Sequence, residues 1–202
     1  MKIIKQNFLY VLGFILTVAS LFSIDIMTKM LAQKYFLLNF SPIDVHDYSS
    51  SFMPVFTLGN ASNWFDFSLT YVRNTGAAWG FLGNMDERYR PYFFNTITTI
   101  AMFLIIVFIY QTPRAKKLAR FGMILIFSGA CGNFFDRFVF HYVVDWLHVR
   151  WNIFSWYYDF PVFNIADSCV TIGVSLLLID MILTERRKKK DGSTTIPQKL
   201  NQ

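Results

Sequence analysis

Two aspartates, Asp145 and Asp167, stand in stretches of the sequence that are otherwise strongly apolar. The first lies in Val-Val-Asp-Trp-Leu (143–147), and the second closes Phe-Asn-Ile-Ala-Asp (163–167). An ionisable side chain is costly to place near a lipid bilayer, so an acid in such a setting indicates a functional site. Two carboxylates that reach one water cannot both be ionised cheaply, so they share a proton and can supply both a base and an acid. The pair is therefore a candidate for acid/base catalysis.

Structural roles for these acids and their neighbours remain open at this stage. One of the two aspartates could pair with Arg137, and the other could cap a helix. Asp25 and Lys29 are four residues apart and could form an ordinary ion pair along one helix. Asp136 could pair with a neighbouring cation or face water outside the membrane.

A metal site is a further alternative, because His141, Asp145 and His148 are close together in the sequence. The stretch that contains them alternates as a β-strand does, so the three side chains need not converge, and we predict no metal. Cys131 and Cys169 each lie in an apolar run without a C-x-x-C partner. We expect both cysteines to be buried packing residues.

The composition indicates a membrane protein. Of the 202 residues, 54% are hydrophobic and 19% aromatic, whereas only 16% are charged. This is too apolar for an ordinary soluble domain. A net charge of +6 would suit nucleic-acid binding, but the basic residues flank apolar runs and do not alternate with aromatic ones. We therefore expect no nucleic-acid partner.

Four apolar runs predict a four-transmembrane-helix bundle, with helices at about 7–30, 92–110, 121–140 and 163–183. Each run is long enough to cross about 30 Å of hydrocarbon. Basic clusters precede the first run, separate the second from the third and follow the last. The positive-inside rule then places both termini in the cytoplasm. We expect a multi-pass protein of the cytoplasmic (inner) membrane, with its polar groups collected near the extracytoplasmic face.

Two outer segments, about 32–91 and 141–161, connect these helices. In the first, the alternating residues 65–72 predict a strand, and a turn follows in which Gly76 supplies the turn geometry. The second is rich in Trp, Tyr and Phe and predicts an aromatic interfacial loop at the lipid headgroups. The expected fold is an all-α membrane protein with a small extracytoplasmic β-containing platform, in a single domain of residues 1–187. Residues 188–202 are predicted to be a disordered, basic cytoplasmic tail.

Four motifs follow one another along the chain, at the outer ends of the predicted helices and strand. They are Asp-Ile-Met-Thr-Lys (25–29), Val-Arg-Asn-Thr-Gly-Ala-Ala-Trp-Gly (72–80), Gly-Ala-Cys-Gly-Asn-Phe-Phe-Asp-Arg (129–137) with Val-Val-Asp-Trp (143–146), and Phe-Asn-Ile-Ala-Asp-Ser (163–168). In this order, the set resembles the lipoprotein signal peptidase (signal peptidase II) family. The resemblance spans about residues 25–173. It departs from the family at Trp146, where Phe is frequent, and in the longer outer segments, which bear on substrate preference.

The resemblance implies a membrane aspartic endopeptidase without a cofactor. Such an enzyme removes the signal peptide from diacylglyceryl-modified prolipoproteins, cleaves before the lipidated cysteine and is inhibited by globomycin. The family's catalytic aspartates correspond to Asp145 and Asp167. Its supporting positions correspond to Asp25, Lys29, Asn74, Gly76, Asn133, Arg137 and Asn164. Expected partners are lipidated prolipoproteins, globomycin-type inhibitors and membrane phospholipid, and we expect a monomer.

The residue types at the supporting positions suit this chemistry independently of the family resemblance. Asn74, Asn133 and Asn164 can hydrogen-bond a substrate backbone or hold the aspartates without adding charge. The last two could instead cap or join helices. Arg137 can anchor a carboxylate or a lipid phosphate.

Three other function classes account for part of the pattern. A proton-coupled transporter with Asp25, Asp136 and Asp167 as a relay would place its acids near the membrane midplane, not at one face. A zinc or serine intramembrane protease would need H-E-x-x-H or G-x-S-x-G, and the sequence has neither. A membrane chaperone that binds lipid or peptide through the aromatic segment would not depend on Asp145.

Overall fold

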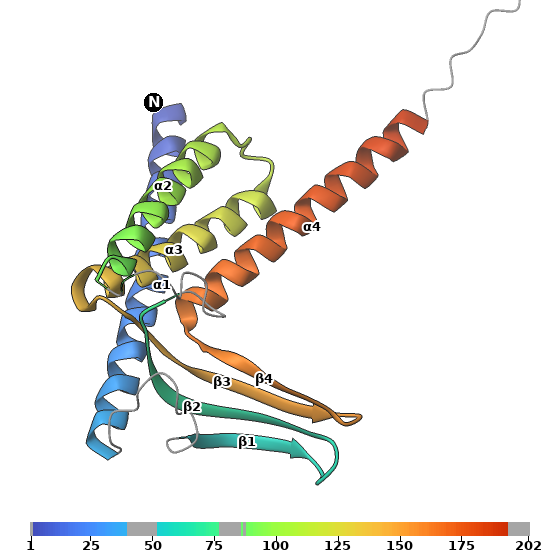
Figure 1. Cartoon of the computed structure of the whole chain (residues 1–202). Coiled ribbons are helices and arrows are strands. Elements are labelled where there is room, and N and C mark those ends of the chain that lie inside the picture. Colours follow the sequence, from blue (N-terminus) through green and yellow to red (C-terminus); the bar gives the residue numbers. More distant parts are fainter. Residues whose placement is uncertain (1, 40–51, 77–85, 87, 194–202) are drawn as a thin grey trace, which may run out of the picture.

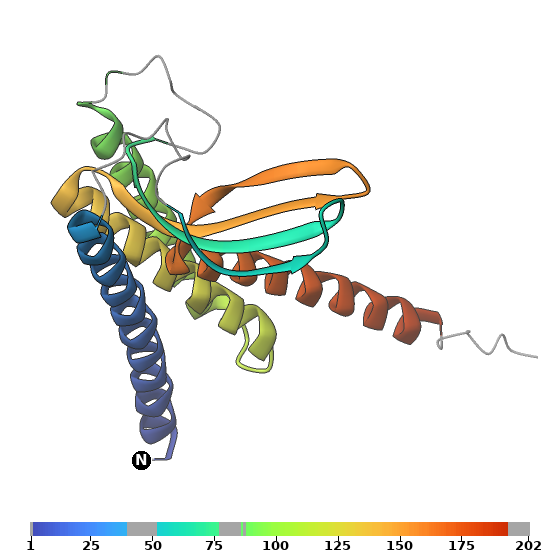
Figure 2. The same ribbon diagram turned by 90° about the horizontal axis from the view of Figure 1, so that it is seen from below.

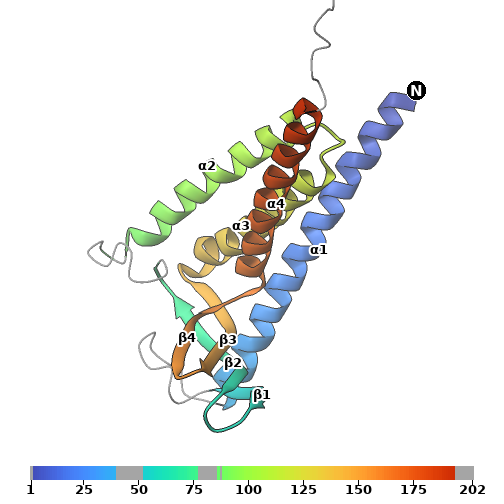
Figure 3. The same ribbon diagram turned by 90° about the vertical axis from the view of Figure 1, so that its right-hand side faces the viewer.

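Four long helices and a four-stranded antiparallel sheet make up the structure, a computed structural model that describes residues 2–39, 52–76, 86 and 88–193. The helices are α1 (Lys2–Asn39), α2 (Arg90–Gln111), α3 (Lys117–Phe140) and α4 (Ile165–Ser193). The strands are β1 (Met53–Gly59), β2 (Trp64–Asn74), β3 (Val143–Ile153) and β4 (Trp156–Phe163). The sheet lies at one end of the helix bundle, opposite the N-terminus and the α2–α3 connection (Figures 1 and 3).

Each helix contains a segment that is long and apolar enough to span a membrane. These segments are Phe8–Leu37, Arg90–Gln111, Lys117–Phe140 and Ile165–Lys189. Among the residues of α2, all of which the structure describes, Pro91 alone is buried. Large apolar side chains along α2, such as Phe103 and Phe108, are exposed. A helix that is apolar on all sides requires a nonpolar surrounding, so the predicted set of four membrane-spanning candidates is confirmed.

The central helix of the bundle is α3, which packs against α1, α2 and α4. It approaches α4 closely because glycines face each other across the contact. A Cβ placed on Gly122 would lie 2.7 Å from the carbonyl oxygen of Gly173, and one on Gly129 would collide with the carbonyl oxygen of Ala166. Membrane helices associate largely through such close packing of small residues, because lipid removes the hydrophobic drive between them.

The order of strands in the sheet is β1-β2-β3-β4, and every neighbouring pair is antiparallel. The central pair joins two parts of the chain that are far apart in the sequence, since Val72 lies opposite Asp145 and Asn74 opposite Val143. This register brings the C-terminal end of β2 beside the N-terminal part of β3. The sheet extends to the same side of the bundle as α4 (Figures 1 and 2).

The helix α1 continues to Asn39, beyond the end predicted near residue 30, because its last turns pack on the sheet. Phe36 is buried against Tyr71 of β2 and Val144 of β3. The helix therefore joins the membrane bundle to the core of the outer region. At the other end of the chain, α4 reaches Ser193 and so includes residues 188–193, for which a disordered tail was predicted. Side-chain pairs four residues apart, such as Glu185–Lys189 at 3.7 Å, support this last part of the helix.

The aromatic segment within residues 141–161, predicted to be a loop, forms the β3–β4 hairpin instead. Its two turn residues, Phe154 and Ser155, have φ of 53° and 63°. Positive φ at both positions suits the twist of a two-residue hairpin, but Asn and Gly are the residues that usually signal such a turn. The N–H of Phe154 donates to Oδ1 of Asn63 at 2.7 Å, which connects this turn to the β1–β2 hairpin.

Candidate active site

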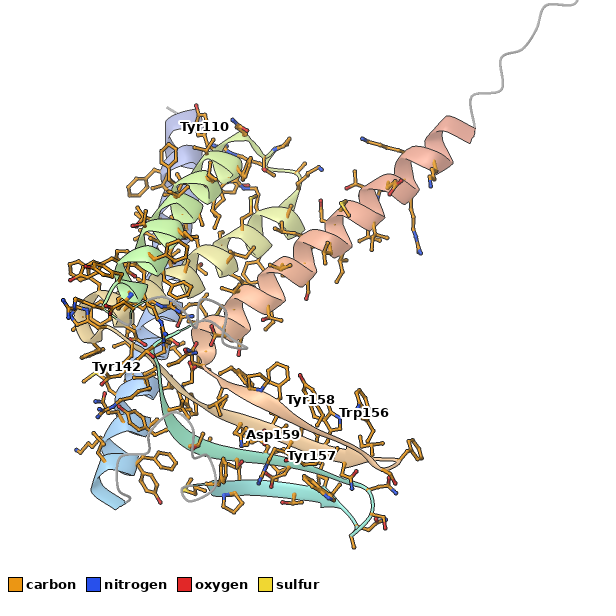
Figure 4. All side chains as sticks on the ribbon, viewed as in Figure 1. Tyr110, Tyr142, Trp156, Tyr157, Tyr158 and Asp159 are labelled. Carbon is orange, nitrogen blue, oxygen red and sulfur yellow. The ribbon has the colours of Figure 1, made fainter. Side chains whose placement is uncertain are left out.

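The two candidate catalytic aspartates meet where the sheet joins the helix bundle. Asp145 is the third residue of β3, and Asp167 is the third residue of α4. Each is close enough to the other for their charges to interact. The remaining polar groups come from the C-terminal end of β2 and from α1 and α3. In Figure 4 this junction lies near the labelled Tyr142, at the opposite end of the bundle from Tyr110.

Asp145 is almost completely buried and accepts two amide hydrogen bonds. Nδ2 of Asn164 donates to Oδ1 at 2.7 Å, and Nδ2 of Asn74 donates to Oδ2 at 2.8 Å. Burial, followed by the nearby charge of Asp167, raises the pKa of Asp145 to about 7, although the two amide hydrogen bonds act in the opposite direction. Asp145 can therefore hold a proton close to neutral pH.

Asp167 is held by reciprocal bonds at the start of α4. Its backbone N–H donates to Oδ1 of Asn164 at 2.8 Å, while the N–H of Asn164 donates to Oδ2 of Asp167 at 3.2 Å. This is the arrangement of a capping box, with the carboxylate in the first turn of the helix. Nδ2 of Asn133 donates to the other oxygen, Oδ1, at 2.7 Å. Burial disfavours the ionised form of Asp167, whereas these donors and the position at a helix N-terminus favour it.

Lys29 binds two further carboxylates next to this pair. Its Nζ lies 2.7 Å from Asp25 of the same helix and 2.9 Å from Asp136 of α3, and all three side chains are buried. The same Nζ donates to Oδ1 of Asn133 at 3.1 Å. Since Oδ1 of Asn133 also accepts from Asn164, at 3.2 Å, the amide nitrogen of Asn133 is directed at Asp167.

The two carboxylates that Lys29 binds also hold the backbone beside the candidate catalytic residues. Oδ2 of Asp136 accepts the N–H of Val144 at 3.1 Å, one residue before Asp145. Oδ1 of Asp25 accepts the N–H of Ala166 at 2.9 Å, one residue before Asp167. Lys29 thus connects α1 and α3 to the two chain segments that carry the aspartates.

Two of the predicted supporting residues contribute in a different way. The guanidinium of Arg137 lies over the ring of Phe94 at 5.0 Å and within electrostatic reach of Asp167, Asp145 and Asp136. Gly76 lies at a bend after β2, its φ is not in the left-handed region, and a Cβ there would meet no described atom within 4 Å. Its N–H donates to Oδ1 of Asn74 at 3.1 Å, so Gly76 orients Asn74 through its backbone.

The histidines weighed as metal ligands belong to different surroundings. His141 ends α3 with a φ of 66°, and Nε2 of His148 lies 2.5 Å from Oδ1 of Asp159 on the neighbouring strand. The ring of His148 also stacks on Phe52, with 4.8 Å between the ring centres. Within the part of the chain that the structure describes, no three His, Cys, Asp or Glu residues are grouped to hold a metal ion.

Comparison with known proteins decides the family. The model of a family described as signal peptidase (SPase) II matches residues 17–183. The chain belongs to the signal peptidase II family. A lipoprotein signal peptidase of Geobacter metallireducens is 46% identical over 126 residues, which are 62% of this chain and 74% of that protein. A lipoprotein signal peptidase of Bacillus subtilis is 42% identical over 125 residues, 62% of this chain and 75% of that protein.

The fold of the chain is also similar to that of solved membrane enzymes. Two chains, each described as a bacterial membrane enzyme structure obtained by the in meso method, are similar to this one. The first has a TM-score of 0.61 and 29% identity, with 94% of both chains covered. The second has a TM-score of 0.59 and 31% identity, with 84% of this chain and 92% of the other covered. This signal peptidase II is thus a multi-pass membrane hydrolase that acts on lipoprotein precursors, as the order of the four motifs predicted.

Sequence reasoning missed one group that shapes the site of this signal peptidase II. A Cβ on Gly132 would collide with the carboxylate of Asp25 and lie 3.1 Å from Cβ of Ala166. Gly132 therefore leaves the space in which Asp25 reaches the N–H of Ala166. The signal in the sequence was the pair Gly129 and Gly132, three residues apart and so on one face of α3.

Replacing Lys29 by Met should strongly destabilise the protein, because two buried carboxylates then lose their shared cation. We expect a loss of about 3–5 kcal/mol in the free energy of unfolding, measured by denaturant titration of the purified protein in detergent. The matched control is Lys189→Met, which removes the cation of the exposed Glu185–Lys189 pair and should change stability by less than about 0.5 kcal/mol. Adding Asp25→Asn to Lys29→Met should restore part of the loss. Equal stability of the two single variants would contradict this role of Lys29.

Proposed function

We propose that Asp145 and Asp167 form the catalytic pair with which this enzyme removes signal peptides from prolipoproteins. The observation that carries the proposal is the placing of both carboxylates in one network of amide hydrogen bonds, formed by Asn74, Asn133 and Asn164. These amides hold the carboxylates without neutralising them, which leaves the proton of the pair available for chemistry. The substrate is a diacylglyceryl-modified prolipoprotein, and the bond cleaved precedes its lipidated cysteine.

The two aspartates divide the work of hydrolysis between them. Asp167, half-buried and at the start of α4, takes a proton from a water that attacks the scissile carbonyl. Asp145, whose pKa is raised to about 7, carries the shared proton and donates a hydrogen bond to the developing oxyanion. The proton held by the pair then passes to the leaving amine, and the starting state is restored when the products depart. Lys29 and Arg137 lie close enough to balance the negative charge.

The sheet supports the handling of a lipidated substrate at the membrane surface. Trp156, Tyr158 and Phe160 alternate along β4 and are in ring contact, while Asp159 and Tyr157 occupy the positions between them. In Figure 4 the labelled Trp156 and Tyr158 lie on the side of the sheet that faces α4. Aromatic side chains favour the headgroup region of a bilayer. Acyl chains of phospholipid and of substrate can then lie beneath this face, while the peptide reaches the aspartates.

Asp145→Asn and Asp167→Asn should each abolish cleavage while the protein stays folded. We expect a loss of about 10⁴-fold or more in kcat, because one member of a cooperating pair is removed. The assay uses a diacylglyceryl peptide, with the unlipidated peptide as the substrate control and a globomycin-type inhibitor as the competitor.

The matched enzyme control is Asp180→Asn, a carboxylate on α4 that lies 3.8 Å from Lys116 and outside the network. It should retain wild-type turnover. Near wild-type cleavage by either catalytic variant would overturn the two-aspartate mechanism. Equal cleavage of lipidated and unlipidated peptide would overturn the proposed substrate class.

The pH dependence of kcat/KM should follow the proton on Asp145. Above about pH 7 this proton is lost, so activity should fall on the alkaline side with an apparent pKa of about 7. The hydrogen bond from Asn74 lowers the pKa of Asp145, so Asn74→Ala should move this fall to higher pH as well as reduce the rate. Thr57→Ala, which removes a hydroxyl bound to Asp66 at 2.9 Å, is the control and should leave the profile unmoved. A shift to lower pH in Asn74→Ala would contradict the assignment.

We also propose that both termini lie in the cytoplasm and that the active site lies near the extracytoplasmic face of the cytoplasmic membrane. The basic residues flanking the helices support this orientation. Single cysteines at the exposed positions Ser155 and Ala115 test it in intact cells, with a thiol reagent that does not cross the membrane. Labelling is expected at 155 and not at 115. The protein without an added cysteine gives the background labelling, which comes from Cys131 and Cys169 within the spanning segments. Labelling at position 115 and not at 155 would contradict the proposed orientation and indicate the opposite one.

A further inference from the structure

A cavity lies between α1 and α2 at the end of the bundle far from the aspartates. Its volume is about 600 Å³, within the range of small-molecule sites. Apolar and aromatic side chains of the two helices form most of its wall, and the α2–α3 connection with the start of α3 forms its rim. The lining includes Tyr10, Val11, Phe14, Ile106, Ile109 and Arg120. Figure 4 shows Tyr110, a further lining residue, at this end of the bundle.

Two guanidinium groups stand at the rim of this cavity. The guanidinium carbon of Arg114 lies 4.5 Å from the ring centre of Tyr10, and that of Arg120 lies 6.0 Å from it. Arg120 also donates from Nη1 to the carbonyl oxygens of Ile109 and Thr112, at 2.7 and 2.8 Å, and so caps the end of α2. These contacts fix both cations on the same side of an apolar hollow. Lys117 adds positive charge to this end of the bundle, whereas Lys116 lies 3.8 Å from Asp180.

We propose that this cavity binds an anionic phospholipid of the inner leaflet. One acyl chain lies between α1 and α2, and the phosphate lies against Arg114 and Arg120. The apolar wall belongs to membrane-spanning segments, so hydrocarbon and not water is its natural filling. Arginine is well suited to phosphate because its planar fork can donate two parallel hydrogen bonds. Basic residues at the cytoplasmic end of membrane helices are attracted to anionic lipids.

The charge at the rim argues against a segment of the substrate as the occupant. A signal peptide begins with a positively charged region, which Arg114 and Arg120 would repel. The cavity is also lined by Tyr110, which lies at the end of the bundle opposite the sheet (Figure 4), whereas Asp145 belongs to β3 of that sheet. The bound lipid would instead fill the space between α1 and α2, since α2 packs mainly against α3.

Native mass spectrometry of the purified full-length protein tests the proposal without using peptidase activity. The probes are dioleoyl phosphatidylglycerol and dioleoyl phosphatidylcholine, which have the same acyl chains and differ in net charge. We expect one phosphatidylglycerol to be retained in preference to phosphatidylcholine. Arg114→Gln should lower its retention by about fivefold, the effect of one cation near an anionic headgroup. Lys117→Gln, a basic residue of the same region that does not line the cavity, is the matched control and should retain the lipid.

A second variant tests the acyl part of the site. Val11→Trp adds bulk to the wall while both arginines are kept, and it should also lower retention of phosphatidylglycerol. Equal retention of the two lipids, or equal losses in Arg114→Gln and Lys117→Gln, would overturn the proposal. Unchanged retention in Val11→Trp, or full displacement of the lipid by inorganic phosphate, would show a surface anion site and no lipid cavity. Each of these outcomes is independent of whether Asp145 and Asp167 catalyse cleavage.

Discussion

The buried ion triad of Lys29 with Asp25 and Asp136 is the interaction on which the rest of the site depends. One ammonium group lies within 3 Å of both carboxylates, and each carboxylate in turn accepts a backbone N–H. Those two N–H groups belong to the residues that precede the proposed catalytic pair. A buried ion triad of this kind is weak evidence for stability as such, because desolvation offsets much of the attraction. The triad instead fixes geometry. Because none of its three buried charges can be left unpaired, α1, α3, β3 and the start of α4 are held in one arrangement.

The same constraint explains why a bundle of membrane helices carries a sheet at one end. Helices deliver Asn133 and Asp167, but Asp145 comes from a strand and Asn74 from the strand paired with it. The antiparallel register between β2 and β3 fixes the amide of Asn74 on the carboxylate of Asp145. Because β4 runs directly into Asn164, the sheet also sets the start of α4. Phe36 at the end of α1 packs on this sheet, so both halves of the molecule share one core there.

The membrane spans could be predicted from the sequence because length and apolarity alone determine them, and their approximate positions were right. Asn164 and Asp167 cap α4, which is one of the structural roles left open. Two further alternatives also proved correct as contacts, since Asp25 pairs with Lys29 and Asp136 pairs with a cation. The cation is the same in both cases, which spacing along the chain could not reveal, because Lys29 and Asp136 are brought together only by helix packing. Alternation around Asp145 indicated a strand, but the β3–β4 turn escaped prediction for a local reason: Phe154 and Ser155 adopt positive φ without being Gly or Asn. The sequence indicated a turn at Gly76 but not that its backbone N–H would orient Asn74, because that contact forms only in the folded chain.

The position proposed for the network, near one face of the membrane, meets two demands that conflict within a bilayer. Hydrolysis consumes water and needs fixed charges, whereas a diacylglyceryl group needs hydrocarbon, and only the boundary between the two media provides both. Charged groups at that boundary can be fully paired by the ends of helices, where backbone N–H groups are left free by the helix itself. Asp25 and Asp167 use such groups at the start of α4, at Ala166 and Asn164. The interior halves of the helices can then stay apolar, which explains why the candidate catalytic groups are confined to one end of the bundle.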